Sequence, residues 1–198
     1  MMFPKELFKR DRENTFRIAA DSELSDSKIA KQMINLFPET TGKDIVIVCI
    51  GSDRATGDCF GPIIGSKLKQ RLNEPFFVYG TLNEPVHAVN LQETLTYIAN
   101  EHPDAFVIGI DACLGISSNV GTITLAQGPV YPGAAMKKDL PAVGDIHLTG
   151  IVNVGGYMEM MVLQNTRLSI VMDMAHVVSS AFSIVEIKLK HLSLQKGG

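Results

Sequence analysis

The sequence predicts an α/β protein, a three-layer sandwich in which a mostly parallel sheet is flanked by helices, and three observations support this fold class. Apolar runs of strand length alternate with segments of helical period in the first half of the chain. The connections between these runs are long enough for the crossovers that parallel pairing requires. The chain has 198 residues, 45% of them hydrophobic, which is enough for one sizeable core in a single domain.

The elements of the first half follow from local patterns. Continuous apolar runs rich in β-branched residues predict strands that are buried on both faces, and the segments between them carry apolar residues at helical spacing. The expected strands cover 44–50, 76–82 and 105–112, and the expected helices begin near Ser25 and cover 62–72 and 91–101. Pro62 suits a first helical turn, and Asn90 is the expected cap of the helix over 91–101.

The second half is less regular. The pattern predicts a strand over 120–126, a long loop rich in glycine and proline over 127–143, a helix over 151–164, a strand over 167–174 and a closing helix over 177–191. Residues 1–22 are polar and charged, without a clear period. We therefore expect an N-terminal arm, 1–22, followed by one α/β domain, 23–198.

Composition excludes several classes of function. The net charge is −3 and no basic run stands out, so nucleic acid is not an expected partner. The three cysteines are odd in number and lack CxxC spacing, which is typical of free thiols in a reducing compartment. The N-terminus has no secretory apolar segment, and no apolar stretch approaches the roughly 20 residues of a membrane span. We expect a cytoplasmic protein that does not enter a membrane.

The most informative segment is the loop over 51–62, which leaves the first strand and enters a helix. It contains Asp53 and Asp58, and it is longer than a simple strand-to-helix turn needs. Ligands of open α/β sheets bind at the carboxyl ends of strands, where this loop is expected to lie. Neither GxxxxGK[ST] nor GxGxxG is present, so nucleotide or flavin binding rests only on analogy of fold.

Asp111 closes a buried apolar strand, where an acid is costly unless it is hydrogen-bonded, paired or functional. A right-handed β-α-β-α-β run commonly gives the strand order 2-1-3, which places strands one and three side by side, about 4.8 Å apart. Asp58 and Asp111 are then expected to face one another across a crevice. One pKa of such a pair should rise, leaving an acid beside a base that could activate water.

Alternatively, the two aspartates could hold a divalent, zinc-like metal ion with a third ligand. His147 is the best candidate for that ligand, because it is expected in a loop just before a helix. His176 and His87 are weaker candidates, and Glu84 could line the same cleft. Cys59 adjoins Asp58, but no histidine is tied to it in sequence, so a thiol nucleophile is a minor alternative.

Two motifs resemble known families. They are Gly51-x4-Thr56-x-Asp58-x2-Gly61-Pro62 and, about 50 residues later, Val107-Ile-x-Ile-Asp111-Ala112. Over most of its length the chain resembles a small family of sporulation proteins described as spore proteases. Over residues 44–112, and more weakly over 147–175, it resembles the spore germination proteases and the hydrogenase-maturation endopeptidases.

The resemblance implies a phosphorylase/hydrolase-like fold and a peptidase-like domain. In the germination protease the matching aspartates are thought to form an acid-protease pair, and they fall on Asp58 and Asp111. In the maturation group the same positions bind a metal with a later histidine, for which His147 is the best match. The expected function is a sporulation-associated protease of the cytoplasm or spore interior, acting on protein or peptide substrates such as spore proteins. Ser52 and Cys59 depart from the family pattern, so the alternative is an inactive sporulation factor that uses the fold as a binding module.

Overall fold

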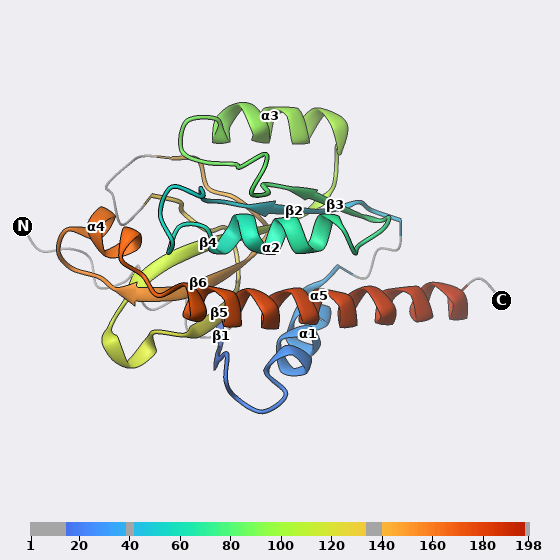
Figure 1. The fold of residues 1–198 in the computed structure, drawn as a ribbon. Helices are drawn as coiled ribbons and strands as arrows, with labels where there is room; N and C mark the ends of the chain where they lie inside the picture. The colour runs from blue at the N-terminus through green and yellow to red at the C-terminus, as the bar shows by residue number, and fades with distance from the viewer. Residues whose placement is uncertain (1–14, 39–41, 134–139, 197–198) are drawn as a thin grey trace, which may run out of the picture.

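The computed structural model describes residues 15–38, 42–133 and 140–196, and its fold is a mixed sheet with helices on both faces (Figure 1). The strands are β1 (Thr15–Ala19), β2 (Ile45–Cys49), β3 (Phe76–Tyr79), β4 (Phe106–Gly115), β5 (Thr122–Gln127) and β6 (Ile146–Val154). The helices are α1 (Ser25–Leu36), α2 (Phe60–Lys69), α3 (Leu91–Glu101), α4 (Glu159–Gln164) and α5 (Leu168–Lys196). A short 3₁₀ turn covers Ser117–Asn119.

The six strands lie in the order β1-β5-β6-β4-β2-β3. β2 pairs in parallel with both β3 and β4, which is the predicted 2-1-3 arrangement of the first three sequence strands. β6 pairs in parallel with β4. β5 pairs with β6 and β1 pairs with β5, both in antiparallel orientation, and these two strands complete the sheet. The α/β class with a mostly parallel sheet is therefore confirmed.

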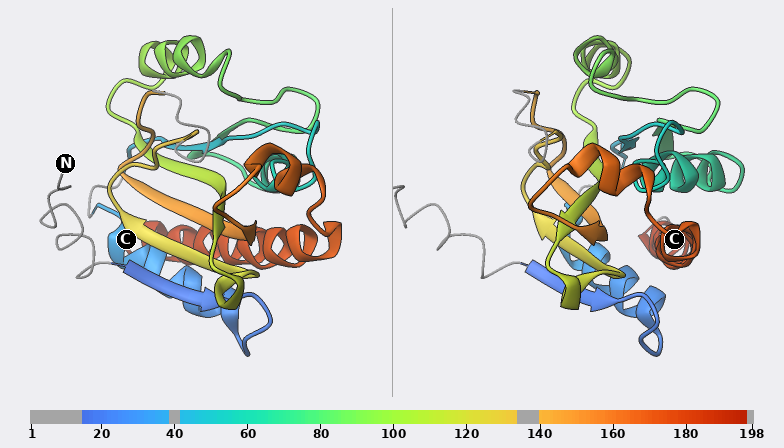
Figure 2. Two further views of the ribbon diagram at one scale, coloured as in Figure 1. Left: turned by 90° about the vertical axis from the view of Figure 1, so that its left-hand side faces the viewer. Right: turned by 60° about the vertical axis from the view of Figure 1, so that its left-hand side comes forward.

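Helices cover the sheet in two layers. α5 packs against α1 and α2 on one face, and α3 lies apart from them on the other (Figure 2). Successive side chains of β2 point to opposite faces of the sheet. Ile45 and Ile47 belong to the core under α2 and α5, whereas Val46 and Val48 belong to the core under α3. The sheet is thus buried on both faces, which explains why β2 is continuously apolar.

Two predicted elements of the second half are wrong. Ile151–Val154 belongs to strand β6, so the helix expected over 151–164 is reduced to α4. Residues expected as a strand over 167–174 form the start of α5, which continues through the predicted closing helix.

The segment expected as an N-terminal arm includes β1, which pairs with β5 at the edge of the sheet. The rest of that segment up to residue 14 lies outside the described residues.

Helix α5 is long and apolar enough to cross a membrane by length and composition, over Leu168–Leu192, which corrects the expectation that no apolar stretch approaches that length. In this structure the helix packs on the sheet. Its residues Val171, Met174, Val178 and Phe182 are fully buried against the core. Core helices of soluble proteins pass the same test of length and composition, so the apolar face of α5 is accounted for by packing.

Candidate active site

The loop that carries Asp58 begins where β2 ends. The Ile50 N–H still donates to the carbonyl of Ile110 on β4, at 2.7 Å, and the next residue, Gly51, donates to the Val86 carbonyl at 2.8 Å. Gly51 has φ +137°, and a Cβ there would lie 2.0 Å from the backbone oxygen of Asp58. Only glycine lets the loop return this closely over the strand it has just left.

Two contacts hold Asp58 in place. The Ser52 hydroxyl donates to Oδ2 of Asp58 at 2.9 Å, which orients the carboxylate. The neighbouring Gly57 N–H donates to the carbonyl of Leu163 on α4 at 2.9 Å, so the loop is tied to an element more than 100 residues later in the chain. A side chain at Gly57 would collide with Leu163 and Thr166, at 2.8 and 2.9 Å. Asp58 is half-buried and has a fixed backbone.

Asp111 lies within β4 rather than at its end, which corrects the expected strand boundary. It pairs with Thr149 on β6, and β4 continues to Gly115. On its other side, however, β2 has already ended, because Cys49 pairs with Ile110. Asp111 is therefore the first residue of β4 beyond the neighbouring strand. Its side chain is beside the crevice although its backbone is held in the sheet.

Burial and charge act together on the Asp111 carboxyl. The residue is 8% exposed, and burial raises its pKa well above the ordinary value. The Asp58 carboxylate raises that pKa further, and a hydrogen bond of 2.8 Å from the Ala112 N–H to Oδ1 opposes the rise. A carboxyl kept protonated beside a second acid is the arrangement that acid–base chemistry needs.

Asp58 and Asp111 line one cavity of about 430 Å³. Its walls come from segments that are far apart in the sequence: the β2 loop, residues 87–89, and α4. Most of the lining is apolar, and Arg54 and His87 are its basic side chains among the described residues. Pockets of this size and character commonly hold small ligands or substrate segments.

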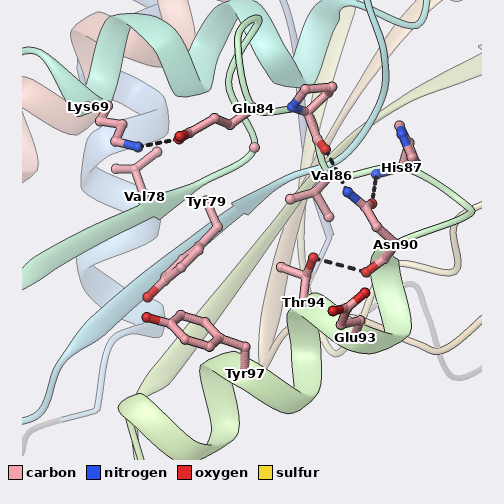
Figure 3. A pocket seen from close by; sticks show the side chains of 12 residues that line it. Lys69, Val78, Tyr79, Glu84, Val86, His87, Asn90, Glu93, Thr94 and Tyr97 are labelled. Carbon is pink, nitrogen blue, oxygen red and sulfur yellow. Dashed lines mark hydrogen bonds and ion pairs between the residues drawn. The ribbon is translucent and has the colours of Figure 1, made fainter.

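Two further cavities adjoin this one. A cavity of about 470 Å³ shares Asp111 and Gly133 with it and is also lined by Thr149 and Glu159. Another, of about 590 Å³, shares His87 and lies between β3 and α3 (Figure 3). Figure 3 shows Tyr79 and Tyr97 in its lining, where their ring centroids lie 6.2 Å apart in an edge contact. Asp111 and His87 thus each line two cavities, the one that holds the aspartate pair and one of its neighbours.

His147 is not brought to the aspartates. It lies in β6 opposite Gly109, two residues before Thr149, and its Nδ1 is 2.8 Å from the carbonyl oxygen of Gly128. It does not line the cavity that contains the pair. Within the described parts of the chain, no three His, Cys, Asp or Glu side chains come close enough to hold a metal ion. The residues present therefore do not fit the metal site that the resemblance implies.

The weaker candidates are dispersed. His87 lines the cavity with the aspartates, and Glu84 forms an ion pair with Lys69 beside the adjacent cavity, at 2.8 Å. His176 is exposed on α5, in the first third of that helix, and does not line the cavity. The Cys59 thiol is buried, which raises its pKa, and its Sγ donates to the Thr56 carbonyl. A thiol nucleophile gains no support from this geometry.

Two contributors to the site were missed from the sequence. Ser52 was noted only as a departure from the family pattern, yet its hydroxyl orients Asp58. Met160 was expected only as part of a helix over 151–164, whereas it lies on the short helix α4, is 50% exposed and lines the cavity. The available signal was the group of three methionines within four residues, Met158, Met160 and Met161.

Comparison with known proteins places these features in a family. Residues 20–181 match the model of a family described as "Protein of unknown function (DUF1256)". The chain is also 49% identical over 166 residues to a Bacillus subtilis (strain 168) protein described as "Uncharacterized protein YyaC", covering 82% of this chain and 81% of the relative. Neither description mentions a protease, so the expected membership of a spore protease family is not confirmed. The chain belongs to the DUF1256 family.

Proposed function

We propose that this protein is a peptide-bond hydrolase in which Asp58 and Asp111 act as an acid–base pair. The observation that carries the proposal is the shared cavity, in which a half-buried carboxylate lies beside a buried acid whose pKa is raised. The cytoplasm of a spore-forming bacterium as its setting, and spore proteins as its substrates, rest on the resemblance of the two motifs alone.

The two carboxyl groups have different roles. Asp58, oriented by Ser52, is the base that takes a proton from a water molecule as that water attacks the substrate carbonyl carbon. Asp111 is the acid that donates its proton to the carbonyl oxygen. As the tetrahedral intermediate collapses, the proton on Asp58 passes to the leaving nitrogen, the C–N bond breaks, and Asp111 recovers its proton from the new carboxylic acid. No step is routed through a metal ion, because the expected third ligand lies elsewhere.

The test is to replace each aspartate singly by asparagine and to measure cleavage of small acid-soluble spore proteins and of an unfolded model protein by mass spectrometry. We expect each variant to lose at least about 100-fold in kcat/KM, the usual contribution of a general acid or base. Asp53→Asn is the matched control, since Asp53 is an exposed acid of the same loop that does not line the cavity.

Equal turnover in Asp58→Asn, Asp111→Asn and the unmodified protein would refute the assignment. If the unmodified protein cleaves none of these substrates, the competing proposal gains ground, in which the fold serves sporulation as a binding module. Cleavage that is lost in both variants but kept in Asp53→Asn would dismiss that alternative.

A further inference from the structure

We propose that the apolar cavity beside the aspartates is a specificity pocket that receives a large aliphatic or aromatic side chain of an extended polypeptide. The inference rests on the proposed hydrolase function and deepens it, because it names the residue type recognised next to the scissile bond. It also assigns to Met160 a role in choosing the substrate.

The lining of the cavity supports an apolar occupant. Ala55, Ala88, Val89, Leu140, Met160 and Leu163 contribute side chains to its walls. Val89 is 89% exposed and Met160 is 50% exposed, so both present apolar surface to water at the cavity. An entering side chain would remove that surface from water, which favours binding by about 25 cal/mol for each Å² covered. A methionine wall can adjust to several apolar shapes.

The neighbouring cavities favour an extended chain as the carrier of this side chain. The 470 Å³ cavity shares the lining residues Asp111 and Gly133 with the apolar cavity, and the 590 Å³ cavity shares His87 with it. The first of these is lined by Gly115, Gly133 and Gly155, which leave room for a substrate backbone. Asp111 lines both this cavity and the apolar cavity. The bond to be cleaved is therefore expected to lie directly beside the pocket.

The chain offers a matched pair of variants. Met160 and Met161 are neighbours on α4 with exposed fractions of 50% and 51%, but only Met160 lines the cavity. Met160→Glu places a charge in the pocket, and Met161→Glu places the same charge on the same helix outside it. The two variants have the same net charge, and the two substitutions should destabilise the helix to a similar extent. A difference in cleavage between them therefore measures the contribution of the pocket.

The experiment profiles cleavage of a peptide library in which each position in turn carries Leu, Phe, Ala, Lys, Asp or Glu in a Gly/Ser background. We expect the unmodified protein to cleave beside Leu or Phe. Met160→Glu should lower kcat/KM for those peptides by about tenfold or more, and Met161→Glu should change it by less than about twofold. A preference for Asp or Glu, which Arg54 at the cavity would favour, overturns the proposal, as does equal loss in both variants.

Binding to the Asp111→Asn protein, followed by fluorescence anisotropy with the same labelled peptides, separates the two proposals. Tighter binding of Leu or Phe peptides that Met160→Glu abolishes, with no cleavage by the unmodified protein, refutes the hydrolase but supports the apolar pocket. Asp111-dependent cleavage without any preference for apolar residues refutes the pocket and leaves the hydrolase intact.

Discussion

A buried acid such as Asp111 is a cost to the folded protein unless something uses it. The backbone N–H of Ala112 gives the carboxyl one hydrogen bond, but burial and the Asp58 carboxylate both oppose its ionisation. The folded state therefore holds a proton on Asp111 at pH values where the unfolded chain has released it. Folding stability must then depend on pH through this residue.

Asp111→Asn should accordingly raise the free energy of unfolding at neutral and alkaline pH. The folded pKa of Asp111 lies above its unfolded value, so the stability tied to its proton is full below about pH 3.9 and is lost as pH rises through the folded pKa. Asparagine stays neutral throughout, and its advantage should be larger at pH 8 than at pH 5. Urea unfolding at the two pH values measures this difference.

Asp173→Asn provides the comparison, because Asp173 is an exposed acid on α5. It should show no such growth in stability between pH 5 and pH 8. A constant difference between Asp111→Asn and the unmodified protein at both pH values would mean that the folded pKa of Asp111 is not raised.

Among the elements, those that local pattern determines were predicted well. β2 is continuously apolar and is β-branched at every position but Cys49, and α3 covers the range expected for it, Leu91–Glu101. Asn90 does stand at the start of α3, but its Oδ1 accepts from the N–H of His87, so it shapes the cavity wall instead of capping the helix.

The second half shows why the rest could not be predicted. Residues 146–154 mix Thr, Asn and Gly among apolar positions, and they form a strand because β4 and β5 pair with both edges. The β-branched start of α5 is helical because it packs against the core of distant elements. The site residues also divide into local and distant ones. Each aspartate could be identified from its own motif. That Met160 reaches the cavity and His147 does not follows from the path of β6 and α4, which the local sequence does not determine.

Gly51→Ala tests how firmly the element geometry holds Asp58. A Cβ would lie 2.0 Å from the Asp58 carbonyl oxygen and would require a left-handed φ, so the loop must move. We expect the free energy of unfolding to fall by about 1–3 kcal/mol and cleavage to be lost with it. Denaturant unfolding and peptide cleavage on the same preparation measure the two effects.

Gly121→Ala is the control that separates the backbone strain of a positive φ from the steric clash of a new Cβ with a neighbouring atom. Gly121 also has a positive φ, +85°, but nothing lies within 4 Å of the position of its Cβ. This variant should show a backbone cost with cleavage retained. If both variants keep full cleavage, Gly51 does not position Asp58.

At the scale of the whole molecule, α5 joins the helices that cover one face of the sheet. It packs against α1 and α2, and Phe182 at its centre is fully buried. Phe182→Ala should lower the free energy of unfolding by about 3–5 kcal/mol, because it leaves a cavity in the principal core. Ile187→Ala, on the same helix at 58% exposure, should cost far less. Thermal and denaturant unfolding measure both, and similar losses would show that α5 is not organised around Phe182.

The tie between Gly57 and Leu163 has a consequence for biosynthesis. Both aspartates precede α4 in the chain, yet Met160 and Leu163 of α4 line the cavity and the Leu163 carbonyl anchors the Asp58 loop. A partly synthesised chain therefore contains Asp58 and Asp111 without the α4 contact that holds the Asp58 loop. Under the proposed function, the site is therefore complete only once α4 has been translated and has joined the Asp58 loop.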